Sequence, residues 1–193
     1  LTTYHIHLRT FSMINKYPGL SDLSDGFAIL AEMSQGKGIT CNQLLSDKTI
    51  SFMKCYLNEI YLTTNITTKH IDIIFYASSF LINISCPPMV LHTKDVINMG
   101  INMFESIGNI ITLPNVQNNE YFLKTINNIL GWIGNILHIH HYMEQYLMQL
   151  LKGNQGTLML SLLKFINDKC AKNRRNTLHN VYLMVNEYHF LRE

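Results

Sequence analysis

The chain has 193 residues, of which 47% are hydrophobic and 15% charged, and its formal net charge is +2. This composition excludes an intrinsically disordered protein, which combines few apolar residues with a high net charge. A net charge this small does not by itself indicate a nucleic-acid-binding protein. We expect a single all-helical domain over residues 1–193, since domains usually contain about 100–200 residues. The same residues can equally be a fragment of a longer chain.

Glycine and proline divide the sequence into segments of helical length, in which apolar residues recur every three or four positions. Residues 1–45 are less regular, with helices expected near 21–34 and 40–63, whereas 46–193 reads as stacked helices. Residues that favour helix N-caps stand before the expected helices at Asp47, at Thr67 or Thr68, at Thr93 and at Thr177. These patterns predict an all-α fold of about eight to ten helices, more than about 60% helical and without a sheet.

Apolar faces follow from the same periodicity. One face is expected on each of three consecutive helices. The residues are Ile71, Ile74, Phe75, Ser78 and Ile82 on the first, Val96, Gly100, Met103, Ile107, Ile110 and Ile111 on the second, and Phe122, Ile126, Ile129, Leu130, Ile133 and Leu137 on the third.

Three asparagines, Asn83, Asn109 and Asn135, are evenly spaced along the chain, and each stands in an isoleucine-rich segment. We call the spacing between neighbouring members of this set the asparagine interval. One interval accommodates one helix and one loop, so that two intervals make a helical hairpin. This regularity favours a stack of helical hairpins. Similar amphipathic helices in an irregular bundle would show comparable spacing, and this alternative stays open.

The asparagine-bearing segments 75–85 and 129–137 resemble the third helix of armadillo repeats, and the resemblance covers roughly residues 67–170. In the peptide-binding armadillo proteins a tryptophan precedes the groove asparagine by four residues, whereas Trp132 precedes Asn135 by three. The spacing between Asn83 and Asn135 also exceeds the usual repeat length. The resemblance therefore implies an armadillo-like or HEAT-like helical-repeat array, that is, an α-solenoid, and an irregular multi-helix bundle is the alternative.

This resemblance implies a non-catalytic scaffold or adaptor that binds a peptide or helix of another protein. The candidate binding residues are Asn83, Asn109, Trp132 and Asn135. Trp132 is also expected to be mostly buried, in which case it is a core residue and does not line a groove. A viral Bcl-2-like bundle that grips an amphipathic helix is a second hypothesis.

Positive charge is concentrated near one predicted loop, where Lys172, Arg174 and Arg175 lie close together. Arginine offers bidentate contacts to phosphate or carboxylate groups, so these residues are further binding candidates for nucleic acid or an acidic peptide. A solvated turn between helices explains the same cluster, and we do not expect nucleic acid as the partner.

Chemical motifs of enzymes and metal sites are missing from the sequence. His138, His140 and His141 form a cluster, but no cysteine and only one nearby carboxylate, Glu144, could complete a metal site. We expect no cofactor, no metal and no enzyme activity. The four cysteines are expected to be reduced and buried, which together with the lack of a signal peptide predicts an intracellular protein, cytoplasmic or nuclear. No membrane span is expected, because Pro87 and Pro88 interrupt the most apolar segment.

Overall fold

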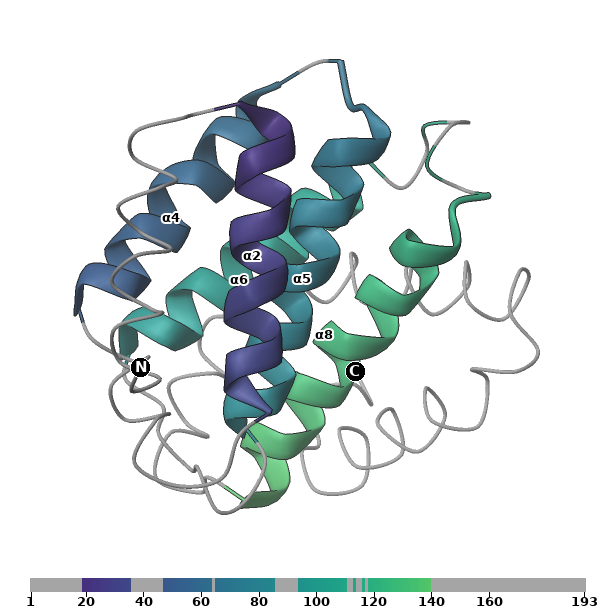
Figure 1. Cartoon of the computed structure of the whole chain (residues 1–193). Helices are drawn as coiled ribbons and strands as arrows, with labels where there is room; N and C mark the ends of the chain where they lie inside the picture. Colours follow the sequence, from purple (N-terminus) through teal and green to yellow (C-terminus); the bar gives the residue numbers. More distant parts are fainter. Residues whose placement is uncertain are drawn as a thin grey trace. The chain divides into compact units, whose positions relative to one another are not determined.

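A computed structural model describes residues 19–35, 47–63, 65–85, 94–110, 113, 116 and 118–139 (Figure 1). The described residues are 88% helical and contain no strand, which confirms the prediction of an all-α fold for this part of the chain. The predicted total of about eight to ten helices and the N-cap at Thr177 depend on residues outside it. The described helices are α2 (Leu20–Ser34), α4 (Asp47–Leu62), α5 (Thr68–Ser85), α6 (Lys94–Ile110) and α8 (Glu120–Ile139).

The chain divides into two compact units, Leu1–Leu91 and His92–Glu193. The first unit contains α2, α4 and α5, and the second contains α6 and α8. The single domain expected from chain length stays a prediction.

Helix starts agree with the N-cap residues read from the sequence. The carbonyl of Thr67 accepts the first hydrogen bond of α5 from the Ile71 amide, at 3.2 Å, so Thr67 is the N-cap residue. The helix α4 begins at Asp47, which the sequence offered as its N-cap, and not near residue 40, whereas α6 begins directly after Thr93. The end of α5 at Ser85 lies two residues before Pro87, because a helix is disfavoured at the residue preceding proline.

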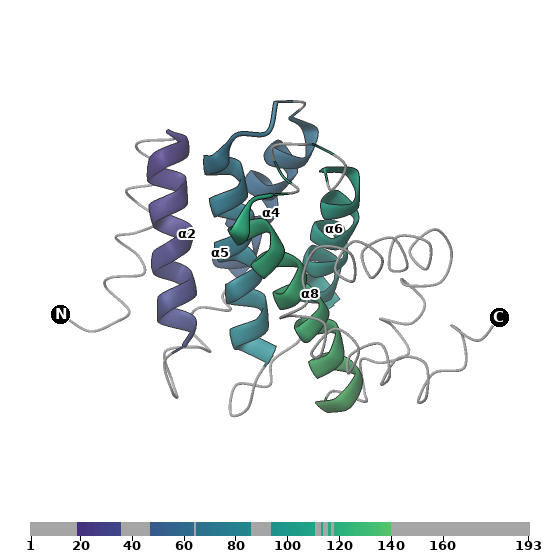
Figure 2. The same cartoon turned by 90° about the vertical axis from the view of Figure 1, so that its right-hand side faces the viewer.

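In the first unit, α2 packs along α5, and α4 also contacts α5. The two helices α2 and α5 run in the same direction, since residues near their carboxyl ends are hydrogen-bonded to each other and both views show them side by side (Figure 1 and Figure 2). The intervening helix α4 runs back in the opposite direction (Figure 1).

The core of the first unit is built from large side chains on all three of its described helices. Completely buried examples are Phe27, Leu30, Met53, Leu57 and Phe80. Removing such side chains from water contributes roughly 1.5–3 kcal/mol each to folding.

The buried face of α5 includes the predicted Ile71, Ile74 and Ser78, whereas Phe75 and Ile82 are only half-buried and lie at its border. The expected face was therefore correct in its centre and wrong at one edge.

Cys55 differs from the sequence expectation. Its thiol is free, as predicted, but it is exposed on α4, so the expectation of a buried cysteine is wrong at this position. A small residue such as cysteine can lie on either the buried or the exposed face of an amphipathic helix. Its type alone therefore does not predict its burial.

Buried hydroxyl groups on these helices bond to their own backbones. Ser34 donates to the Ala31 carbonyl at 2.6 Å, and Ser78 donates to the Phe75 carbonyl at 2.7 Å. In helices, Ser and Thr hydroxyl groups often donate a hydrogen bond to the backbone carbonyl one turn earlier in this way. Polar residues can consequently occupy the apolar face, which explains why Ser78 fits a stripe of isoleucines.

In the second unit, α6 contacts α8, and the indole of Trp132 lies directly against the backbone of Gly100. A methyl group at Gly100 would approach three carbons of the six-membered indole ring to less than 3.0 Å. Trp132 has no exposed surface, as the sequence led us to expect. The remaining predicted faces of this unit are also buried, at Val96, Met103, Ile107, Ile110, Phe122, Ile126, Ile129, Leu130 and Ile133. Ile111 and the Leu137 side chain lie outside the described residues.

We predict that Gly100→Ala destabilises the protein by about 1–3 kcal/mol, because the added methyl group must displace a fully buried indole. Alanine by itself favours a helix over glycine by about 1 kcal/mol, so a loss of stability would report the steric contact. Gly131→Ala, on the half-buried side of α8, is the matched control and should be neutral or stabilising. Urea denaturation measures both, and equal effects of the two substitutions would contradict the packing of Trp132 on Gly100.

Candidate functional site

Asn83 links α5 to α2. Its amide nitrogen donates to the Ala31 carbonyl at 3.2 Å and to the Ser34 hydroxyl oxygen at 3.0 Å. The side chain is half-buried, and its amide nitrogen is committed to α2. A peptide that bound Asn83 would have to compete with these two contacts, so the structure gives this asparagine a role in joining helices.

Trp132 and Asn135 lie three residues apart on α8 and are neighbours on its surface, but they differ in burial. Trp132 is at the edge of the buried side and is fully buried, whereas Asn135 is half-buried and lies at the edge of the side that is open to solvent. The residues that share this side with Asn135 are spaced by three and four positions, which places them along one face of the helix. We call this set the α8 stripe; it consists of Tyr121, Lys124, Asn128, Gly131 and Asn135, all exposed or half-buried.

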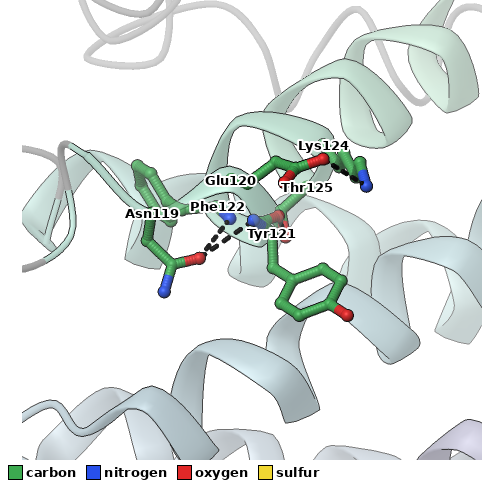
Figure 3. A network of polar contacts seen from close by, with 6 residues as sticks. All are labelled: Asn119, Glu120, Tyr121, Phe122, Lys124 and Thr125. Atoms are coloured by element: carbon green, nitrogen blue, oxygen red, sulfur yellow. Dashed lines mark hydrogen bonds and ion pairs between the residues drawn. The ribbon is translucent and has the colours of Figure 1, made fainter.

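The first turn of α8 holds the amino-terminal part of this stripe in place (Figure 3). The side-chain oxygen of Asn119 accepts hydrogen bonds from the amides of Tyr121, at 2.9 Å, and Phe122, at 3.2 Å. Asn119 is therefore the N-cap of α8. Thr125 donates to the Tyr121 carbonyl at 2.8 Å, so the backbone of Tyr121 is bonded on both sides.

A salt bridge and a ring contact orient the exposed side chains of this turn. The Lys124 ammonium lies 2.7 Å from a Glu120 carboxylate oxygen and 5.4 Å from the centroid of the Tyr121 ring (Figure 3). The hydrogen bond to Glu120 raises the pKa of Lys124 above its ordinary value, so the ammonium is charged at neutral pH. Tyr121 is 42% exposed, although it is a large aromatic residue.

The exposed groups of this turn are an aromatic ring, a phenol hydroxyl and a charged side chain. An exposed tyrosine beside a positive charge offers apolar area, a phenol hydrogen bond and a cation, which are the properties of residues that dominate protein interfaces. Within the ranges that the structure describes, no group of three or more His, Cys, Asp or Glu residues could hold a metal ion. No described helix is long and apolar enough to cross a membrane.

Several predicted site residues lie beyond what the structure describes. The backbone of Asn109 belongs to α6, but its side chain is not among the described ones, and Lys172, Arg174 and Arg175 lie outside the described residues. The same holds for the histidine cluster apart from the backbone of His138 in α8. Their roles stay predictions.

Sequence reasoning missed Asn119, Tyr121 and Lys124. A signal was present, since an asparagine directly before the apolar periodicity of α8 is typical of an N-cap. Tyr121 and Lys124 stand three positions apart, and Lys124 follows Glu120 by four, which are the spacings of helical neighbours. Their exposure, however, becomes visible only when the buried side of α8 is known.

No protein-family model, curated protein or solved structure matches this chain.

We predict that Asn83→Ala lowers stability by about 0.5–1.5 kcal/mol, the usual net contribution of an intramolecular hydrogen bond. A double-mutant cycle with Ser34→Ala should give a coupling energy of similar size, because the two side chains bond to each other across α2 and α5. The control cycle pairs Asn83→Ala with Ser78→Ala, whose hydroxyl bonds to a carbonyl on its own helix, and should be additive. Equal coupling in both cycles would contradict the contact.

Proposed function

We propose that this protein is a non-catalytic helical scaffold that holds a peptide or helix of another protein against the α8 stripe. The observation that supports this most directly is Tyr121, a large side chain that stays 42% exposed while the backbone around it is capped and bonded. An ordered aromatic side chain loses little conformational freedom when a partner covers it, which favours binding.

The regular spacing of the helices supports a repeat architecture for the scaffold. The helices α5, α6 and α8 begin at Thr68, Lys94 and Glu120, and each start follows the previous one by the asparagine interval. The N-caps Thr67 and Asn119 are separated by two intervals, and so are the completely buried aromatic residues Phe80 and Trp132. Helix boundaries therefore follow the spacing that the asparagines define.

Burial follows the same spacing. When α5 is aligned with α8 so that Asn83 superposes on Asn135, residues 68–83 match residues 120–135 in their degree of burial at every position except 71, 72 and 82. The positions of the asparagines alone define this register, independently of burial. The helices α2 and α5 pack in parallel, and α4, which comes between them in the sequence, runs in the opposite direction. Alternate helices of a solenoid are arranged in the same way.

We expect the partner to be a protein, since the α8 stripe combines one aromatic residue, amide groups and a single ion pair without an excess of positive charge. Nucleic acid would require several cations along the surface to contact successive phosphates. The α8 stripe shows one lysine, which is paired with Glu120.

We predict that Tyr121→Ala weakens binding of the captured partner by about tenfold or more, since interface anchors contribute at least about 1–2 kcal/mol. The partner is first isolated with the wild-type chain and identified, and its affinity is then measured with purified proteins. Ile29→Ala is the matched control, because Ile29 on α2 is 40% exposed and lies in the other unit.

Both variants should unfold at the wild-type temperature, since neither side chain is in the core. Equal affinities of wild type and Tyr121→Ala for every captured protein would contradict the proposed surface. If only Ile29→Ala lost binding, the binding surface would lie on α2 and not on α8.

A further inference from the structure

The start of α5 carries a histidine in an unusual position. His70 is the third residue of the helix and only 8% exposed. Its Nδ1 atom lies 3.0 Å from the Thr67 backbone nitrogen, which donates to it, and 2.7 Å from the Thr67 hydroxyl oxygen. The ring thus reaches back over the first turn and contacts the N-cap residue twice.

This arrangement corresponds to a capping box, in which the third helical residue accepts a hydrogen bond from the N-cap amide. Glutamate or glutamine usually supplies the acceptor, and here the imidazole does. Because the Thr67 amide can only donate, Nδ1 must carry no proton, and the neutral ring therefore holds its proton on Nε2. The Thr67 hydroxyl then also donates to Nδ1.

Protonation of His70 is incompatible with these contacts. A proton on Nδ1 would point at the Thr67 amide, which is itself a donor and would lose its acceptor. The contact with the Thr67 hydroxyl could persist only if Nδ1 became the donor and the hydroxyl oxygen the acceptor. The ring would also place a positive charge at the amino end of a helix, where the backbone dipole favours negative charge.

Charged neighbours do not offset this cost. Lys69 and Asp72, which stand before and after His70 in the sequence of α5, form an ion pair with each other with a nitrogen–oxygen distance of 3.8 Å. Burial, and not a nearby charge, is the cause that lowers the pKa of His70 below its ordinary value of 6.5. The helix α5 packs against α2 and α4. The other described charged or titratable side chains on these three helices are Asp22, Asp25 and Glu32 on α2, Lys54, Cys55, Tyr56 and Glu59 on α4, and Tyr76 on α5.

We propose that His70 is a pH-sensitive latch, which holds Thr67 and the connection 65–67 to the first turn of α5 at neutral pH and releases them when the ring takes up a proton. The direction follows from proton linkage. The unfolded or opened state binds the proton more readily than the latched state, so the contribution of the latch is fully present above pH 6.5. It is lost as the pH falls from 6.5 through the lower pKa of the folded protein.

The equivalent turn of α8 lacks this latch. In the alignment that superposes Asn83 on Asn135, the residue that corresponds to His70 is Phe122, and the cap there is the Asn119 side chain, which does not titrate. The first intrahelical hydrogen bonds of the two helices are alike, from Ile71 to Thr67 and from Leu123 to Asn119, both at 3.2 Å. The chain therefore contains its own control for the effect of pH on a helix start.

The test compares hydrogen-exchange protection of the Ile71 and Leu123 amides in the wild-type chain at pH 7.5, 6.5 and 5.5. Protection factors, which correct for the intrinsic pH dependence of exchange, should fall for Ile71 below pH 6.5 by up to about tenfold per pH unit, the limit for uptake of one proton. Protection of Leu123 should stay constant. Equal changes at both amides, or none at Ile71, would overturn the proposal.

His70→Gln is the decisive variant, because glutamine retains the acceptor of a capping box and cannot titrate. It should keep the protection of Ile71 at pH 7.5 and abolish its decrease at pH 5.5. If this variant does not fold, the double substitution Thr67→Asn with His70→Phe transfers the cap of α8 to α5 and should give the same result. An NMR titration of wild-type His70 that gave a pKa at or above 6.5 would also overturn the latch.

Discussion

The constraint on which this structure depends is that each helix must bury a wide face and keep only a narrow one for solvent. On α8 the buried side includes Phe122, Ile126 and Trp132, and the positions left outside include the α8 stripe, whose members are spaced by three and four. On this helix a recognition surface would have to use exposed or half-buried positions, because the fully buried ones are needed for packing. The close contact of Trp132 with Gly100 fixes the rotation of α8 about its axis and thereby decides which residues form the stripe.

The sequence predicted the apolar faces of α6 and α8 and most helix starts, because both are determined by local periodicity and by N-cap residues. It could not predict the partner of Asn83, since the contact to Ala31 and Ser34 joins residues far apart in the chain. The same limit applies to Gly100, where periodicity places the residue on the buried face but does not show that an indole covers it. Tertiary contacts of this kind depend on how two helices pack, which no single helix encodes.

The candidate site shows the same division. Asn135 was found from the sequence because of its spacing, whereas Tyr121 was not, because an aromatic residue next to an apolar stripe is more often buried than exposed. The two helix starts at Thr67 and Asn119 show how similar backbones can differ in chemistry. The amide donors of α8 are satisfied by a side chain that never titrates, and those of α5 depend in part on an imidazole. A similar degree of burial therefore does not imply a similar response to solution conditions.

The parallel orientation of α2 and α5 limits how this chain can change its length. After α2 the chain must travel back along the unit before α5 can begin, and α4 makes this return (Figure 1). If α4 were lost, α5 would begin at the opposite end of the unit and run antiparallel to α2. Its apolar side would then face away from the core. Insertions or deletions between α2 and α5 would therefore preserve this packing only if the chain still returned along the unit before α5 began.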